Sequence, residues 1–130
     1  MFFVADRALK YFAPSINFEG GFVKFGFYKN YTGAFSLPIA GSWYNAAGVI
    51  LLIVFLFLCL GERKKSRIKF IAYELILFGG ISNMSDRFAL GYTIDYVNFM
   101  NFSFFNIADA MLLGGIFILL ISQFKKRYET

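Results

Sequence analysis

The chain contains no histidine and only one cysteine in 130 residues. The absence of histidine excludes the Ser-His-Asp and Cys-His nucleophile systems and the histidine-based zinc motifs. A single cysteine allows no intrachain disulfide and no thiolate metal cage. Cys59 lies inside an apolar run, where we interpret it as a side chain that either packs in the core or faces lipid. If this chain carries out chemistry, its carboxylates must do so.

Charged residues are also scarce. They make up 16% of the chain, against about 25% in average soluble domains. Hydrophobic residues make up 58%, and the mean hydropathy is +0.60. This composition indicates an integral membrane protein, and the length leaves room for a single domain, residues 1–130.

The net charge of +5 does not indicate a nucleic-acid partner, because of where the basic residues lie. Five of the thirteen lysines and arginines lie in segment 61–69, and three more lie in segment 125–130. Short basic segments beside apolar runs are what the positive-inside rule produces on the cytoplasmic side of a membrane. We therefore expect both segments, and both termini, in the cytoplasm.

Two apolar segments, 42–60 and 105–124, are long enough to cross about 30 Å of hydrocarbon. Segment 70–86 is interpreted as a third span, although it contains Glu74. Cytoplasmic termini then require a first span within 1–13, which is too short for a full helix and is either truncated or lies partly in the interface. A cleaved signal peptide is disfavoured there, because the apolar stretch is short and interrupted by an aspartate. The predicted fold is an α-helical integral membrane protein with about four transmembrane helices, the first one short.

The loops 13–41 and 88–104 are then extracytoplasmic. In the first loop, aromatic residues alternate with other residues over 24–28, which is the period of two typical of a strand, and Gly20 and Gly21 supply a turn. We predict a small extracytoplasmic β-hairpin or cradle that rests on the membrane surface with its aromatic rings at headgroup depth. The second loop is expected to cover the membrane entrance.

Asp109 stands in an apolar segment, where a charge at depth costs at least about 2 to 3 kcal/mol. One explanation is structural: Asn106 caps the last helix, and Asp109 completes a capping box that the helix dipole favours. The other involves Asp95, which taken alone is an ordinary loop acid. If the loop folds back over the start of the last helix, the two carboxyls meet and share a proton. One acid and one base is the state that activates water against an amide carbonyl, as in the aspartic proteases.

The remaining acidic residues admit structural roles. Asp6 and Lys10 are four residues apart and can pair across one helical turn, and Glu74 can reach back to the basic cytoplasmic face or pair there. Asp86 and Arg87 are adjacent, so they do not face each other on a helix. They either form a solvated helix end, or Arg87 binds a carboxylate or a substrate carbonyl while Asp86 holds it or a backbone N–H.

Five segments, taken in order, resemble the sequence blocks of the lipoprotein signal peptidases, also called signal peptidase II. They are DRALK (6–10), NYTGAFS (30–36), GGISNMSDR (79–87), GYTID (91–95) and FNIAD (105–109). The corresponding family patterns are DxxTK, NxGAAFS, GGxGNxxDR, GxVVD and FNxAD. Because the five blocks occur in order over nearly the whole chain, the resemblance is specific.

The resemblance implies an intramembrane aspartic endopeptidase that cuts diacylglyceryl-modified prolipoproteins just before the lipidated cysteine. It implies a monomer in the bacterial cytoplasmic membrane, in contact with membrane lipid, with the active site near the outer leaflet and no metal or organic cofactor. Carried over by position, Asp95 and Asp109 are the catalytic dyad. The residues that bind substrate or support the site are Asn30, Asn83, Asp86, Arg87, Asn106 and Asp6.

The sequence departs from the family pattern at a few positions. Ser82 replaces a glycine, Thr32 and Gly33 replace Gly-Ala, and the loop between the two aspartates is short and lacks a Trp-containing segment. Two rival functions stay open: a homologue that binds lipidated peptides without cutting them, and a small proton-coupled transporter or channel subunit that uses the aspartates along a pathway. A dyad requires the two carboxyls close together at the outer end, whereas a relay requires acids spread in depth.

Overall fold

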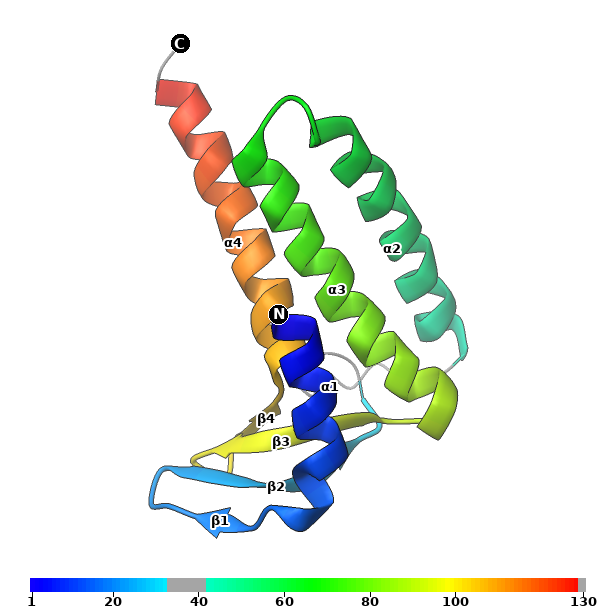
Figure 1. Cartoon of the computed structure of the whole chain (residues 1–130), viewed down its shortest axis with the longest axis vertical. Coiled ribbons are helices and arrows are strands. Elements are labelled where there is room, and N and C mark those ends of the chain that lie inside the picture. The colour runs from blue at the N-terminus through cyan, green and yellow to red at the C-terminus, as the bar shows by residue number, and fades with distance from the viewer. Residues whose placement is uncertain (33–41, 129–130) are drawn as a thin grey trace.

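The structure is a computed structural model that describes residues 1–32 and 42–128. Three long helices run side by side, and a small sheet lies across one end of them (Figure 1). The helices are α1 (Phe2–Phe12), the 3₁₀ helix η1 (Ala13–Ser15), α2 (Ser42–Glu62), α3 (Arg67–Leu90) and α4 (Ile107–Tyr128). The strands are β1 (Phe18–Glu19), β2 (Val23–Asn30), β3 (Thr93–Phe99) and β4 (Ser103–Phe105). The predicted helical fold with a small antiparallel sheet is confirmed.

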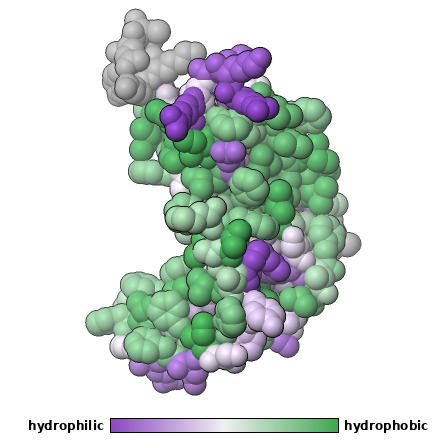
Figure 2. All heavy atoms as spheres, in the orientation of Figure 1, coloured by the Kyte–Doolittle hydropathy of each residue, from purple (hydrophilic) through white to green (hydrophobic). Residues whose placement is uncertain are grey.

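Within the described residues, two helices are long and apolar enough to cross a membrane, over Trp43–Glu62 of α2 and Ile107–Phe124 of α4. Only 6% of the α2 window and 22% of the α4 window are buried inside the protein, whereas the core helix of a soluble protein would be mostly buried. Apolar residues also cover most of the visible surface along the helices (Figure 2). Exposed apolar helix faces fit lipid as the surrounding solvent. The count of four spans stays a prediction.

α3 is longer than the predicted span 70–86 at both ends, and its caps explain why. The Ser66 side chain accepts a hydrogen bond from the backbone N–H of Lys69 at the start of the helix. At the other end, Gly91 adopts a φ of 81°, a left-handed conformation that glycine tolerates best, and its N–H donates to the carbonyl of Arg87. α3 therefore extends as far as the sheet, and the polar side chains of its last turns lie beside the sheet.

The sheet is antiparallel, with the strand order β1-β2-β3-β4. β2 pairs with β3 in a register that sets Val23 opposite Phe99 and Tyr28 opposite Asp95. The second outer loop supplies β3 and β4, which the sequence did not predict, and its covering of the membrane entrance stays a prediction. Pairing with β2 explains its extended backbone. Asp95 is thereby held on a strand and not on a free loop.

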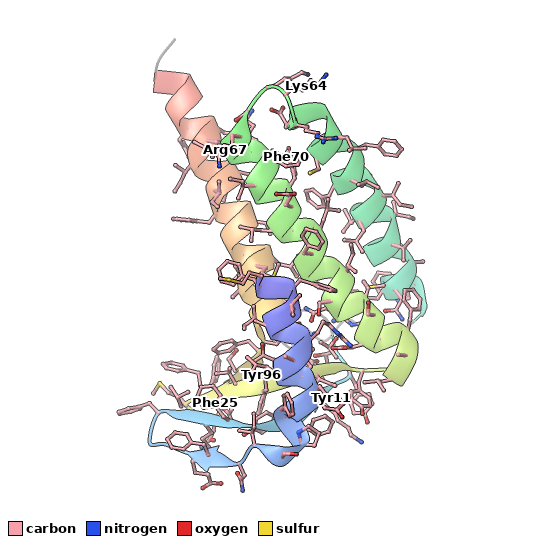
Figure 3. All side chains as sticks on the ribbon, in the orientation of Figure 1. Tyr11, Phe25, Lys64, Arg67, Phe70 and Tyr96 are labelled. Atoms are coloured by element: carbon pink, nitrogen blue, oxygen red, sulfur yellow. The ribbon has the colours of Figure 1, made fainter. Side chains whose placement is uncertain are left out.

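α1 joins the sheet to the long helices, since it contacts α3, α4 and β3. Ala13, Ile94 and Tyr96 form a small buried core, against which Leu9 and Phe27 pack. Figure 3 shows Tyr96 where α1 crosses the sheet, while Lys64 and Arg67 lie at the opposite end of the helices. The polar side chains of α1 are thus brought to the junction of sheet and helices.

α3 and α4 approach each other closely at Gly115. A Cβ added there would lie 2.5 Å from the carbonyl oxygen of Ala72 and 2.6 Å from Cγ1 of Ile76. A Cβ at the neighbouring Gly114 would meet no atom within 4 Å. Small residues that let helix backbones approach are the usual means of packing helices in lipid.

These two glycines make a matched pair for a stability test. Gly115→Ala is expected to destabilise the protein by about 1 to 3 kcal/mol, because the new methyl group overpacks a backbone contact. Gly114→Ala is expected to cost nothing, since alanine is the better helix former and has open space. Thermal unfolding of both variants in detergent measures the difference. Equal unfolding midpoints for the two would contradict the close α3–α4 packing.

Candidate active site

Polar and charged side chains are buried where α1, α3, β3 and the start of α4 meet. The buried polar residues among those that the structure describes are Asp6, Lys10, Ser82, Asn83, Asp86, Thr93, Asp95, Asn98, Asn106 and Asp109. Burying a polar group is costly unless it is hydrogen-bonded, and burying a charge is costly unless it is paired. The contacts that satisfy these groups therefore define the site.

Asp95 and Asp109 are 0% and 3% exposed, and two asparagines link them. Nδ2 of Asn106 donates to Oδ1 of Asp95 at 2.8 Å. Nδ2 of Asn83 donates to Oδ1 of Asp109 at 2.8 Å. The same Nδ2 of Asn106 also donates to Oδ1 of Asn83 at 3.1 Å, which closes the chain of contacts between the two aspartates. The structure thus brings together four of the eight residues that the sequence assigned to one site.

The start of α4 forms the predicted capping box. The backbone N–H of Asp109 donates to Oδ1 of Asn106 at 2.9 Å, and the backbone N–H of Asn106 donates to Oδ2 of Asp109 at 3.3 Å. Each side chain satisfies a backbone donor that the first helical turn leaves unpaired. The structural explanation for Asp109 is therefore correct, and it does not exclude the other, because Oδ1 still faces Asn83.

Asp95 has a second amide donor on its other oxygen. Nδ2 of Asn30 donates to Oδ2 of Asp95 at 2.9 Å, and Oδ1 of Asn30 accepts from the backbone N–H and the hydroxyl of Thr32. Burial raises the pKa of Asp95 to about 6, and repulsion from Asp109 adds to the rise. Asp95 can thus hold or release a proton close to neutral pH. Gly33, which also departs from the family pattern, lies outside the described residues.

Asp6 anchors α1 to the site. It forms the predicted ion pair with Lys10, with Oδ2 of Asp6 at 3.0 Å from Nζ. Its carboxylate also accepts from the hydroxyl of Ser82 at 2.6 Å, the hydroxyl of Tyr96 at 2.9 Å and the backbone N–H of Ala108 at 3.1 Å. Burial raises the pKa of the Tyr96 hydroxyl, so this group stays protonated and donates. One buried carboxylate thus ties together α1, α3, β3 and α4.

Asp86 and Arg87 have separate surroundings. Asp86 is fully buried, pairs with Lys10 and Arg7, and accepts from the backbone N–H of Ile94 at 3.2 Å. The interpretation of these two residues as a solvated helix end is therefore wrong for Asp86, because α1 and β3 cover that end of α3.

Arg87 binds no carboxylate among the ion pairs of the described residues. Its Nη2 donates to the carbonyl of Thr32 at 3.4 Å, and its guanidinium lies 5.0 Å from the centre of the Tyr44 ring.

Glu74 has no ion pair within the described part of the chain, so its predicted pairing with the basic face is not seen.

The comparison with known proteins decides the family. The family model described as Signal peptidase (SPase) II matches residues 1–125. The chain belongs to the signal peptidase II family. The resemblance found in the sequence is confirmed.

Named relatives agree with this membership in the signal peptidase II family. The chain is 32% identical over 114 residues to the lipoprotein signal peptidase of Caldicellulosiruptor bescii, and the aligned region covers 87% of this chain and 75% of that protein. It is 32% identical over 121 residues to the lipoprotein signal peptidase of Streptococcus agalactiae serotype Ia, and the aligned region covers 91% of this chain and 75% of that protein. It is 35% identical over 112 residues to that of Streptococcus pyogenes serotype M6, with 84% and 74% covered.

Two solved structures share the fold. One, described as a bacterial membrane enzyme at 2.3 Å resolution, has a TM-score of 0.82, is 22% identical, and covers 99% of this chain and 86% of its own. A second bacterial membrane enzyme, at 1.9 Å, has a TM-score of 0.72 at 22% identity and covers 94% of this chain and 86% of its own. At such low identity the match establishes the arrangement of helices and sheet alone.

The sequence did not predict the contacts that three further residues make in the site of this signal peptidase II chain. Lys10 was seen only as the partner of Asp6, yet it also contacts Asn83. Ser82, which replaces a family glycine, donates to Asp6. Tyr96 gave one signal, since it directly follows Asp95 in the sequence. Among the described residues, no group of three or more histidine, cysteine, aspartate or glutamate side chains is placed to hold a metal ion.

Proposed function

We propose that this chain is an intramembrane aspartic endopeptidase that cuts diacylglyceryl-modified prolipoproteins just before the lipidated cysteine. The observation that carries the proposal is the pair of buried aspartates, Asp95 and Asp109. Both carboxyls accept hydrogen bonds from Asn106, that of Asp95 from the side-chain amide and that of Asp109 from the backbone N–H. Membership in the signal peptidase II family supports the peptidase activity, and the names of the relatives support a lipoprotein substrate.

The mechanism follows from two neighbouring carboxyls that share one proton. The ionised aspartate takes a proton from a water molecule, which attacks the carbonyl carbon of the scissile bond. The protonated aspartate donates to the carbonyl oxygen as the tetrahedral intermediate forms. The raised pKa of Asp95 supports its role as the group that holds the proton at the start. Asn83 and Asn106 hold the two carboxyls in place.

The location of the site supports a position near the outer leaflet. Lys64 and Arg67, in the basic loop, lie at the end of the helices that is far from the sheet, whereas Asp95 lies on β3 (Figures 1 and 3). If the basic end is cytoplasmic, the site faces the outer side. The proposed enzyme therefore sits in the bacterial cytoplasmic membrane with the end of α4 on the cytoplasmic side, and it meets its substrate from the lipid. α1 begins partway along the long helices (Figure 1), and a cytoplasmic N-terminus stays a prediction.

Of the two rivals, the proton relay has the weaker support. A relay requires acids distributed along the depth of the membrane, and here both candidate carboxyls accept hydrogen bonds from the same residue, Asn106. Glu74, which lies nearer the basic end of α3, forms no ion pair with a described cation. A homologue that binds lipidated peptides without cutting them shares the same site and is separated only by experiment.

The test is cleavage by the purified chain in detergent. A diacylglyceryl-modified prolipoprotein and the same chain without the lipid are incubated with the protein, and the products are identified by mass spectrometry. The proposal predicts a product that begins at the lipidated cysteine and no product from the unmodified chain. A cut at another bond, or equal cleavage of both substrates, would overturn the assignment.

The pH dependence of kcat/KM should report Asp95, because this ratio reflects the groups of the free enzyme. The active state has one proton shared by the two carboxyls, so Asp95 must stay protonated, and its pKa is raised to about 6. Activity is therefore expected to fall as the pH rises through about 6, and to fall again at low pH when the second carboxyl also gains a proton. A rate that is flat from pH 5 to 8 would contradict the shared proton.

A further inference from the structure

Lys10 is the most deeply buried cation of the described chain, with 1% of its side chain exposed. Its Nζ lies 2.8 Å from Oδ2 of Asp86 and 3.0 Å from Oδ2 of Asp6. These two ion pairs compensate its charge, and a structural role would need nothing more. Nζ also donates to Oδ1 of Asn83 at 2.9 Å, and the hydroxyl of Ser82 lies 3.3 Å away.

The contact between Lys10 and Asn83 determines which way the side-chain amide of Asn83 faces. Oδ1 of Asn83 accepts from Nζ of Lys10 and from Nδ2 of Asn106, so both of its neighbours on that side are donors. A flipped amide would set its own NH₂ group against an ammonium and another amide NH₂. Nδ2 of Asn83 is therefore directed to Oδ1 of Asp109. Lys10 reaches a proposed catalytic oxygen through a single side chain.

We propose that Lys10 is a positioning residue for the proposed dyad: through Asn83 it fixes the orientation of Asp109, and its charge favours the ionised state of the pair. This inference rests on the proposed function. The other charged and titratable groups that face this cluster are Asp6 and Arg7 of α1, Asp86 of α3, Asp95 and Tyr96 of β3, and Asp109 of α4.

Arg7 provides the matched control. Like Lys10 it comes from α1 and pairs with Asp86, but its second contact is the backbone carbonyl of Ser82 and not Asn83. Arg7→Met and Lys10→Met therefore each remove one cation from Asp86. Lys10→Met removes in addition the cation that pairs with Asp6 and the donor that fixes Asn83, and it is the loss of this donor that the Asn83→Leu background below isolates.

The test compares kcat, KM and the pH profile of prolipoprotein cleavage. Lys10→Met is expected to lower kcat about tenfold or more with little change in KM, and to move the alkaline limb of kcat/KM upward by about one pH unit. The direction follows because the charge of Lys10 lowers the pKa of Asp95, so its removal raises that pKa. Arg7→Met is expected to leave the limb where it is. An equal shift in both variants would overturn the inference.

A second comparison keeps the inference testable if Lys10→Met does not fold. The double variant Lys10→Met with Asp86→Asn removes one cation and one anion, so the buried net charge is unchanged. It is expected to shift the pH profile relative to Asp86→Asn alone, and an unshifted profile would overturn the inference.

The route through Asn83 is tested in an Asn83→Leu background. There, Lys10→Met is expected to lower kcat by less than about twofold further, because the two residues act as a unit. A full tenfold effect in that background would refute the route. A parent that cuts no prolipoprotein refutes the proposed function and this inference together, whereas an active parent with an unshifted Lys10→Met refutes this inference alone.

Discussion

Asp109→Asn is expected to lower the rate of prolipoprotein cleavage by about 10⁴-fold, and Asp95→Asn is expected to do the same. Asparagine keeps the shape of the side chain and an oxygen that accepts hydrogen bonds from Asn83 or Asn106. It can neither take a proton from water nor share one with the other carboxyl. Single-turnover rates of both variants, with binding of the intact substrate as the check on folding, measure the effect.

Two acidic residues away from the site serve as controls. Glu19 is exposed on β1, and Glu74 lies in α3 without an ion pair in the described chain. Glu19→Gln and Glu74→Gln are both expected to cleave at the rate of the parent. Loss of activity in Glu74→Gln comparable to that of the aspartate variants would favour a relay of acids along the membrane. Retained activity in either aspartate variant would remove that residue from the dyad.

Asp6→Leu is expected to produce the largest loss of stability, about 3 to 5 kcal/mol. The carboxylate is fully buried and is the acceptor for Lys10, Ser82, Tyr96 and the backbone N–H of Ala108. Leucine accepts none of these hydrogen bonds, so buried donors lose their partner and a buried ammonium loses one of its two anions. The midpoint of thermal unfolding in detergent measures the change.

Glu19→Leu is the corresponding control, because it removes a carboxylate of the same charge from an exposed strand position. Its expected effect is within about 0.5 kcal/mol of zero. Asp6→Asn should fall between the two, since asparagine still accepts at one oxygen. An Asp6→Leu variant that unfolds at the midpoint of the parent would show that α1 is not held at the site by this carboxylate.

Local features of the fold were predictable from the sequence, because their causes are local. The capping box of Asn106 and Asp109 needs only residues three apart, and the pair of Asp6 and Lys10 needs residues four apart. The sheet was harder to predict. β3 pairs with β2 across about seventy residues of chain, with Val23 set opposite Phe99, and nothing in the second loop alone specifies its partner.

The site divides in the same way. The motif blocks identified Asn83, Asn106 and the two aspartates, and the structure brings them into contact. The sequence did not predict that Lys10 reaches Asn83, because pairing with Asp6 already accounted for its charge. Contacts of this kind depend on how α1 is packed against α3 and the sheet. Helical periodicity specifies a face of α1, but not the partner of that face.

The most direct test of the central claim measures binding and cleavage on one sample of the folded parent. A diacylglyceryl-modified prolipoprotein is added in detergent near pH 6, the bound fraction is determined, and the same tube is followed for release of the signal peptide. The account predicts that bound substrate is cut and that the product begins at the lipidated cysteine. Substrate that stays bound and intact would contradict the peptidase assignment and identify a lipopeptide-binding protein.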